Sequence, residues 1–437
     1  MIILYFAIII IFIVWGFKDY KKSFIAYSAV SLLFNAGMAI RYAPPSISVN
    51  LVLNLFFVIL YFTVEKKKYK SFAVFPLKKA FYWMVFSITI SALITWVNGS
   101  FSGITSAINN ILGIYLFVYI FWNICDGYKD IKYFVLCLIV VFILVYIYGV
   151  FEYITRSNPF LDLIKDMIPE EYADDKLYVS DLENLRDGRF RAQSLFFITI
   201  LYGISSLLFM FFILNIRKYK HLFKIKKTGI YFLVIFSLFA CYASNSKTPL
   251  VALPFFIMPL VIKNKFLFSL LVIMAFVFLL DPTILLSPLG NIIDLKAFDV
   301  NNSDMSEGSN AYMRLLQLEA SVEYWMKSPF FGNGLRSGAM FSERDVRLFG
   351  CESVWFRTMI ESGALGLIAY IKLIIDSLKT SVKFDKTYYI FFYSLAFYLI
   401  CSITDINYTM YFMCFCIMLK LCMLNKYKYL ENNRPWL

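Results

Sequence analysis

The stretch "YFVLCLIVVFILVYIYGVFEYI" occupies residues 133–154 and is apolar along nearly its whole length. A helix rises about 1.5 Å per residue, so roughly 20 residues cross the hydrocarbon core of a bilayer, which is about 30 Å thick. The stretch is therefore long enough to span a membrane as a helix. A strand of a membrane barrel would alternate polar and apolar residues, and this stretch does not.

The composition of the whole chain agrees with a membrane protein. Hydrophobic residues make up 60% of the 437 residues and charged residues 16%, and the mean hydropathy is +0.70, which is far from the values of soluble domains. We predict an all-α polytopic membrane helix bundle of about 12–13 transmembrane helices, with 1–437 forming a single integral membrane domain. The expected spans lie near 2–17, 23–40, 46–64, 80–97, 104–124, 133–154, 194–214, 229–243, 248–262, 266–286, 353–376, 388–403 and 408–424.

The charge pattern predicts how these spans are oriented. The net charge is +13, and its basic residues fall in every second loop, such as "EKKKYKSFAVFPLKK" and "KYKHLFKIKK". Because basic loops stay in the cytoplasm, we expect the N-terminus outside and the C-terminus inside. The charge thus reflects topology, and we expect no nucleic acid partner. The two long polar segments, 155–193 and 287–352, both become loops on the outer face, and we expect short helices within them.

The second outer loop ends in an unusual polar stretch. Residues 311–328, "AYMRLLQLEASVEYWMKS", have helical periodicity, and we expect an interfacial amphipathic helix with Leu315, Tyr324 and Trp325 on its apolar side. Pro329 ends this helix, and "GNGLRSG" follows at 332–338. The glycine spacing does not fit the G-x-G-x-x-G nucleotide loop, and no strand precedes it. A turn that docks the outer helix against the next span is therefore expected.

The outer face carries candidate site residues that are mostly cationic. The lone histidine, His221, lies in a basic inner loop, so neither a histidine-based triad nor a histidine-rich metal site is expected on the outer face, and we predict no metal. Isolated cations at span ends can simply snorkel. A cluster of them favours an anion site, and guanidinium groups suit a diphosphate. The candidates are Arg189, Arg191, Lys247, Arg314, Arg336 and the acidic Glu352.

These residues carry a resemblance to a known family. The motifs are "R-x-x-S-x-F" from Arg191, the Ser246–Lys247 pair, Arg314 at the start of an outer helix, "PFFGNG" from Pro329 and "ESVWFRTMIESGALGLI" from Glu352. In this order they resemble the O-antigen polymerase and O-antigen ligase superfamily. The motifs cover the second half of the chain, and the helix count and loop sizes extend the resemblance to the whole chain.

The resemblance implies a GT-C-like membrane glycosyltransferase that uses neither a nucleotide sugar nor a metal, so that no cofactor is expected. It implies a multi-pass protein of a bacterial inner membrane with its active site facing the periplasm. The implied partners are polyprenyl-diphosphate-linked oligosaccharides and membrane lipids, with a chain-length regulator protein as a further candidate.

The resemblance also assigns roles to particular residues. Arg191 matches an arginine that we assign to the donor diphosphate and to catalysis, and Lys247 and Arg314 match further family cations. Arg189 and Arg336 are proposed as diphosphate ligands from position alone. Glu352 stands where ligases tend to carry a histidine, which favours a polymerase. Glu352 is expected either to act as the catalytic base or to pair with Arg336 or Arg357.

Three alternatives to the polymerase remain. A ligase would transfer the glycan to lipid A core instead of to a lipid-linked repeat unit. A flippase would share the lipid-linked substrate, but we expect internal repeats and short loops in that class. A non-enzymatic scaffold would explain the outer loops without needing the cations.

Overall fold

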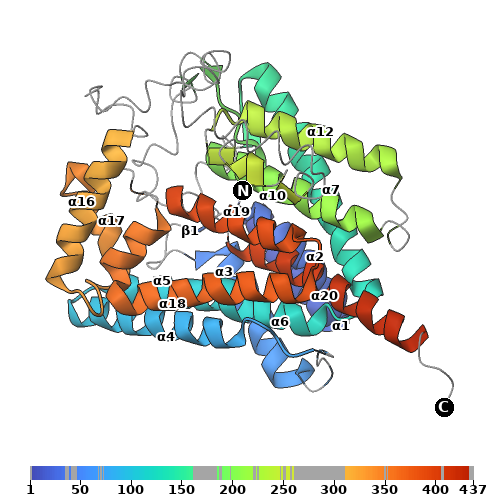
Figure 1. Ribbon diagram of the computed structural model, residues 1–437, viewed down its shortest axis with the longest axis horizontal. Coiled ribbons are helices and arrows are strands. Elements are labelled where there is room, and N and C mark those ends of the chain that lie inside the picture. The colour runs from blue at the N-terminus through green and yellow to red at the C-terminus, as the bar shows by residue number, and fades with distance from the viewer. Residues whose placement is uncertain are drawn as a thin grey trace.

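The structure is a computed structural model of the chain, shown in Figure 1. It describes residues 2–34, 39–40, 47–66, 68, 71, 73–160, 185–186, 189–196, 198–219, 223, 226–246, 248–249, 252–255, 258–259, 311–348, 351, 353–404 and 408–432.

The described residues form a helical membrane bundle. Six helices are long and apolar enough to cross a membrane, and four shorter apolar helices accompany them. The predicted all-α polytopic fold is therefore confirmed. The helices of the bundle are α1 (Ile2–Lys18), α2 (Tyr20–Val30), α3 (Val49–Leu60), α4 (Lys78–Val97), α5 (Ser102–Asn110), α6 (Phe117–Ile124), α7 (Tyr128–Thr155), α10 (Thr199–Ile216), α12 (Lys227–Ala243), α18 (Val354–Phe384), α19 (Tyr389–Ile403) and α20 (Tyr408–Asn432).

The remaining elements are short. Helices α16 (Ala311–Lys327) and α17 (Ser337–Ser342) precede α18. Two small antiparallel pairs are formed by β1 (Ala39–Ile40) with β2 (Ile47–Ser48), and by β3 (Leu185–Arg186) with β4 (Arg189–Phe190). A π-helical segment, Ile111–Leu116, joins α5 to α6 into one continuous span.

Most predicted spans coincide with a helix of the structure. The span predicted at 80–97 is α4, and that at 388–403 is α19. The span predicted at 194–214 starts later, at Thr199, because Ser194 has a positive φ of 52° that does not fit a helix. The span predicted at 248–262 lies partly outside the described residues and that at 266–286 lies wholly outside them, so the total of 12–13 stays a prediction.

The helices α4 and α18 pack along one another, and α18 also packs on α19. Figure 1 shows α16 and α17 at one end of these spans, with α16 running across their direction. We call this the α16 end. The last turns of α7 and α12 meet at residues 192–194, which lie just before α10 and bond to both helices.

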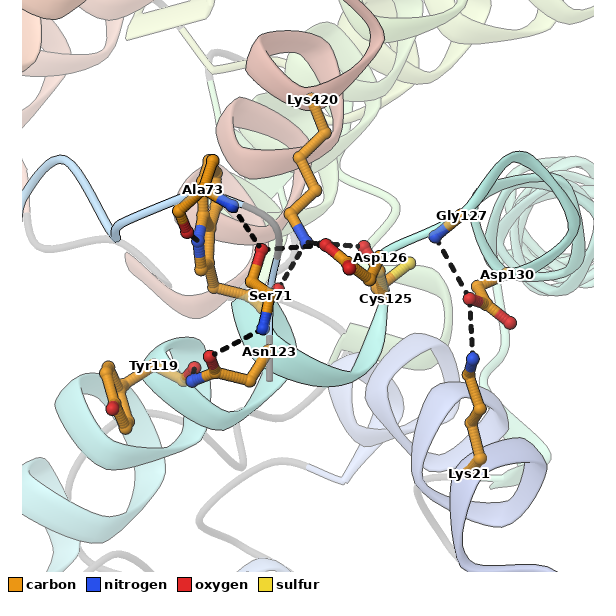
Figure 2. A network of polar contacts seen from close by, with 11 residues as sticks. Lys21, Ser71, Ala73, Tyr119, Asn123, Cys125, Asp126, Gly127, Asp130 and Lys420 are labelled. Atoms are coloured by element: carbon orange, nitrogen blue, oxygen red, sulfur yellow. Dashed lines mark hydrogen bonds and ion pairs between the residues drawn. The ribbon is translucent and has the colours of Figure 1, made fainter. Parts of the chain in front are cut away.

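The opposite end is held together by a buried lysine, shown in Figure 2. The ammonium of Lys420, on α20, donates to the carbonyl oxygens of Trp122 and Cys125 and forms an ion pair of 2.8 Å with Asp126. The Asp126 carboxylate also accepts a hydrogen bond of 2.7 Å from Ser71 Oγ. A buried cation is costly unless it is paired, and here it joins α20 to the connection between α6 and α7.

The helix α18 is broken at Gly363. This residue has φ 58° and ψ −151°, a conformation almost restricted to glycine. The break leaves carbonyl oxygens without their partners within the helix. The carbonyl of Ile360 accepts a bond of 2.8 Å from the Asn333 amide, and that of Glu361 accepts one of 3.1 Å from the Gly334 amide. The chain between α16 and α17 thus replaces the missing helical bonds.

The backbone amides that follow the break also find their hydrogen-bond partners in this turn. The amide of Ala364 donates to the carbonyl oxygen of Pro329 at 2.8 Å, and that of Leu365 donates to Phe330 at 3.0 Å. Backbone groups at membrane depth must find partners within the protein, because lipid offers none. The turn of residues 328–336, which we call the docking turn, supplies both donors and acceptors to α18. This confirms the expected turn against the next span.

We predict that Gly363→Ala destabilises the protein. A Cβ at this position would lie 2.6 Å from the Gly332 nitrogen and 2.8 Å from the Pro329 oxygen, and the backbone conformation adds strain of about 1–3 kcal/mol. The thermal midpoint in detergent, measured by size-exclusion chromatography after heating, should fall. Gly338→Ala is the control, because its Cβ would meet its nearest atom at 3.4 Å. An unchanged midpoint for Gly363→Ala would show that the break does not need glycine.

Candidate functional site

The docking turn is fixed to α4 as well as to α18. The amide of Leu335 donates to the Ser91 carbonyl at 3.1 Å, and Thr95 Oγ1 donates to the Leu335 carbonyl at 2.9 Å. Ser91 Oγ donates to the Glu361 carbonyl at 2.6 Å. A Cβ at Gly334 would lie 2.5 Å from Thr95 Oγ1, so only glycine fits there. The docking turn therefore lies between α4 and the break in α18 and is hydrogen-bonded to both.

Arg336 is the last residue of the docking turn and immediately precedes α17. Its φ is +69°, which residues with a side chain rarely adopt, and the residue is half-buried. Within the part of the chain that the structure describes, its guanidinium forms no hydrogen bond or ion pair. Backbone strain of this kind is held only where the surroundings fix it, and it is common at ligand sites. The structure thus places Arg336 firmly at the α16 end.

Two further arginines act electrostatically on Cys351. Burial raises the pKa of the Cys351 thiol, and the charges of Arg314 and Arg357 act on it in the opposite direction. Arg314, on α16, also donates to Gln317 Oε1 at 3.0 Å. Cys351 is the neighbour of Glu352 in the chain. Glu352 itself is outside the described residues, and its role stays a prediction.

The helix α16 exists as predicted, but its apolar side was assigned incorrectly. It packs on α18, and its buried residues are Met313, Gln317, Ala320 and Ser321. Leu315 is 58% exposed and lies on the opposite side from the partly buried Tyr324. The buried side is therefore made largely of small and polar residues, whereas four apolar residues are exposed: Leu315, Leu318, Val322 and Met326.

Arg191 lies in a second group, between α10 and α12. The amide of Ala192 donates to the carbonyl of Ala243, the last residue of α12, at 2.9 Å. The guanidinium of Arg191 donates to the Ser244 carbonyl at 3.5 Å and to Thr199 Oγ1 at 2.6 Å. Arg191 is thus held against the segment that leads to Lys247, three residues after Ser244. Lys247 is outside the described residues, so its predicted role beside Arg191 at the diphosphate stays a prediction.

Glu152 is a residue of this second group to which the sequence assigned no role. It is fully buried near the end of α7. Its carboxylate accepts hydrogen bonds from the amides of Ser194 at 2.5 Å and Gln193 at 3.1 Å, and from Asn158 Nδ2 at 3.1 Å. An acidic residue inside an apolar run is a functional candidate by its cost alone, and this signal was present in the sequence.

The predicted cations therefore belong to two places. Arg314 and Arg336 are on α16 and at the start of α17, whereas Arg191 lies between α10 and α12; Figure 1 shows these pairs of helices in different parts of the molecule. The backbone of Arg189 is in β4, opposite Arg186 of β3. Convergence of all these cations on one diphosphate stays a prediction. In the described ranges, no group of three or more metal-ligating side chains is found.

We predict that Thr95→Val loosens the docking turn. The substitution keeps the shape of the side chain but removes its bond to the Leu335 carbonyl, which typically costs about 1 kcal/mol. Hydrogen exchange at residues 332–338 should become faster. Thr89→Val is the matched control on the same helix, because Thr89 is exposed and bonds only to Val85 of its own helix. Equal exchange in both variants would refute the anchoring role of Thr95.

Comparison with known proteins gives one match to a family. Residues 232–371 match the family model described as O-Antigen ligase. The matched range begins within α12 and ends within α18, so it contains Ser244, α16, the docking turn and the break at Gly363. Searches of curated proteins and of solved structures give no match. The match supports the superfamily of O-antigen ligases and polymerases, and it does not separate the two activities.

Proposed function

We propose that the protein is a membrane glycosyltransferase that polymerises polysaccharide repeat units. It would transfer a growing glycan from polyprenyl diphosphate to a sugar hydroxyl of an incoming lipid-linked repeat unit, on the outer face of a bacterial inner membrane. The observation that carries this proposal is the O-Antigen ligase match over residues 232–371, which includes the segment against which Arg191 is held.

In the proposed reaction, Arg191 binds the diphosphate of the donor. A guanidinium group can hold two phosphate oxygens at once, and its charge stabilises the negative charge that grows as the diphosphate leaves. The contacts of Arg191 to Ser244 and Thr199 fix its place before the substrate arrives. Lys247 would add a second positive charge from the same segment. Arg189, Arg314 and Arg336 are further proposed ligands of the substrate phosphates.

Glu352 is the proposed base. The attacking hydroxyl oxygen forms a bond to the anomeric carbon of the donor, and the bond from that carbon to the diphosphate breaks. The hydroxyl proton passes to the Glu352 carboxylate, and the diphosphate takes the electron pair of the broken bond. Arg314 and Arg357 act electrostatically on Cys351, which is next to Glu352 in the chain, and positive charges favour the ionised form of a carboxylate. A pairing role for Glu352 would use the same cations.

The choice of polymerase over ligase rests on Glu352 and Ser353. These residues stand where the resemblance leads us to expect histidine and asparagine in ligases. The description of the matched family favours the ligase as the second candidate. The two activities differ in the acceptor, which is a lipid-linked repeat unit for a polymerase and lipid A core for a ligase.

We predict that Arg191→Ala lowers turnover by about 10²–10³-fold, as expected when a group that stabilises developing charge is lost. Glu352→Gln should also lower turnover, because an amide cannot accept the proton. The assay uses purified protein with a synthetic polyprenyl-diphosphate-linked repeat unit and follows the ladder of products without added metal or nucleotide. Arg344→Ala is the control, since Arg344 is an exposed arginine of the second outer loop, which also contains Glu352.

The outcomes separate the candidate functions. Full activity of both Arg191→Ala and Glu352→Gln would refute the site. A single transfer to added lipid A core, without a ladder, would identify a ligase. Movement of the lipid-linked unit across a vesicle membrane without any transfer would identify a flippase.

A further inference from the structure

We propose that Glu152 is a positioning residue that sets the place of Arg191 at the outer end of α7, α10 and α12. This inference rests on the proposed function, because it concerns how Arg191 is brought to the donor diphosphate. Glu152 has an exposed fraction of 0%, and the other charged residues of α7, Lys129, Asp130 and Lys132, all lie near the opposite end of that helix. A buried carboxylate lowers the stability of the fold unless it is hydrogen-bonded, so the groups that bond to it indicate its role.

Glu152 holds the backbone just after Arg191. One oxygen of the carboxylate, Oε2, accepts the amides of both Gln193 and Ser194, at 3.1 and 2.5 Å. The other oxygen, Oε1, accepts from Asn158 Nδ2 at 3.1 Å. The same Asn158 amide group donates to the Ser194 carbonyl at 3.2 Å. Both polar groups of the Ser194 backbone are therefore fixed to the end of α7.

Ser194 needs this support because its backbone is strained. Its φ is +52°, in the left-handed region that a residue with a side chain rarely adopts. Its hydroxyl adds a bond of 2.6 Å to the Val145 carbonyl, two turns earlier in α7. The bend at Ser194 turns the chain from the outer loop into the bundle, where α10 begins at Thr199.

The segment is also held from the side of α12. The amide of Ala192 bonds to the Ala243 carbonyl at 2.9 Å. The backbone on the C-terminal side of Arg191 is therefore clamped between Glu152 of α7 and the last residue of α12. With the backbone fixed, the guanidinium reaches Ser244 and Thr199. Removal of the carboxylate would release two adjacent amides at once and let Arg191 move.

A carboxylate suits this task better than a neutral group. Hydrogen bonds from backbone amides to an ionised carboxylate are roughly twice as strong as bonds between neutral groups. Glutamine could keep the two amide bonds through its oxygen. Its NH₂ group, however, would face the NH₂ group of Asn158, which also donates. We therefore expect a graded series, in which Glu152→Gln has a smaller effect than Glu152→Ala.

The test measures binding of undecaprenyl diphosphate to the full-length protein in nanodiscs, with undecaprenyl monophosphate as the comparison ligand. Arg191→Ala should weaken diphosphate binding by about tenfold or more, which corresponds to about 1.4 kcal/mol. Glu152→Ala should lower the preference for diphosphate over monophosphate to a similar degree, and Glu152→Gln to a smaller one. The double variant should bind no more weakly than Arg191→Ala alone, because both changes remove the same contact.

Ser237→Ala is the matched control. Ser237 is buried on α12 and bonds to Tyr146 of α7 at 2.7 Å, so its loss weakens the same helix contact away from Arg191. It should leave the ligand preference unchanged. If Glu152→Ala does not fold, Glu152→Gln decides. A purely structural role would lower the yield or thermal midpoint of the Glu152 variants but not their ligand preference.

The possible failures are distinct. If Arg191→Ala lowers binding but the Glu152 variants keep the wild-type preference, the positioning role is wrong and the proposed function stands. If the effects of Glu152→Ala and Arg191→Ala multiply in the double variant, Glu152 acts independently of Arg191 and the positioning role is again wrong. If Arg191→Ala binds like the wild type, the assignment of Arg191 to the diphosphate fails, and the positioning role fails with it.

Discussion

The hydrogen bonds between the docking turn and the broken helix α18 are the interaction on which the α16 end depends. A helix that is interrupted near a membrane leaves amides and carbonyls that lipid cannot satisfy. Residues 329–334 provide partners on both sides of Gly363. Since α16 precedes this turn and α17 follows it, the positions of both short helices, and of Arg336 between them, follow from the same set of bonds.

The group around Arg191 and Glu152 also supplies partners for backbone amides outside a helix, but the partner there is a carboxylate. Where the chain enters the bundle at Ser194, the amides of Gln193 and Ser194 have no helical partners, and the carboxylate of Glu152 receives them. At the docking turn the partners are backbone groups and neutral side chains such as Ser91 and Thr95, whereas at Ser194 the partner is a buried carboxylate. In both places a positive φ marks the residue where the chain bends, Arg336 in the first and Ser194 in the second.

The sequence predicts the helices, but it does not predict where a helix is broken. Apolar runs such as 80–97 predict spans because their length and composition are set by the membrane. The break in α18 was not predictable, because "MIESGALGLI" at 359–368 continues a helical pattern and glycine is common within membrane helices. The buried side of α16 was missed because it consists largely of small and polar residues such as Ala320 and Ser321, whereas apolar residues such as Leu315 are exposed.

The docking turn and the group around Arg191 both contain features that lower the stability of the fold, and this is relevant to the proposed chemistry. A positive φ at Arg336 and at Ser194 lowers stability, and so does a fully buried carboxylate at Glu152. Each feature lies near a candidate cation. Arg336 is itself a candidate, Ser194 is three residues after Arg191, and Glu152 is hydrogen-bonded to Ser194. Stabilisation of a leaving diphosphate is most effective when its cations are fixed before the charge develops, because no rearrangement is then needed during the reaction. A flexible loop could carry the same arginines at lower cost, but it would have to order them in each turnover. The strained, hydrogen-bonded backbone beside Arg191 and at Arg336 is therefore what transfer from a lipid diphosphate would require, and what membrane anchoring alone would not.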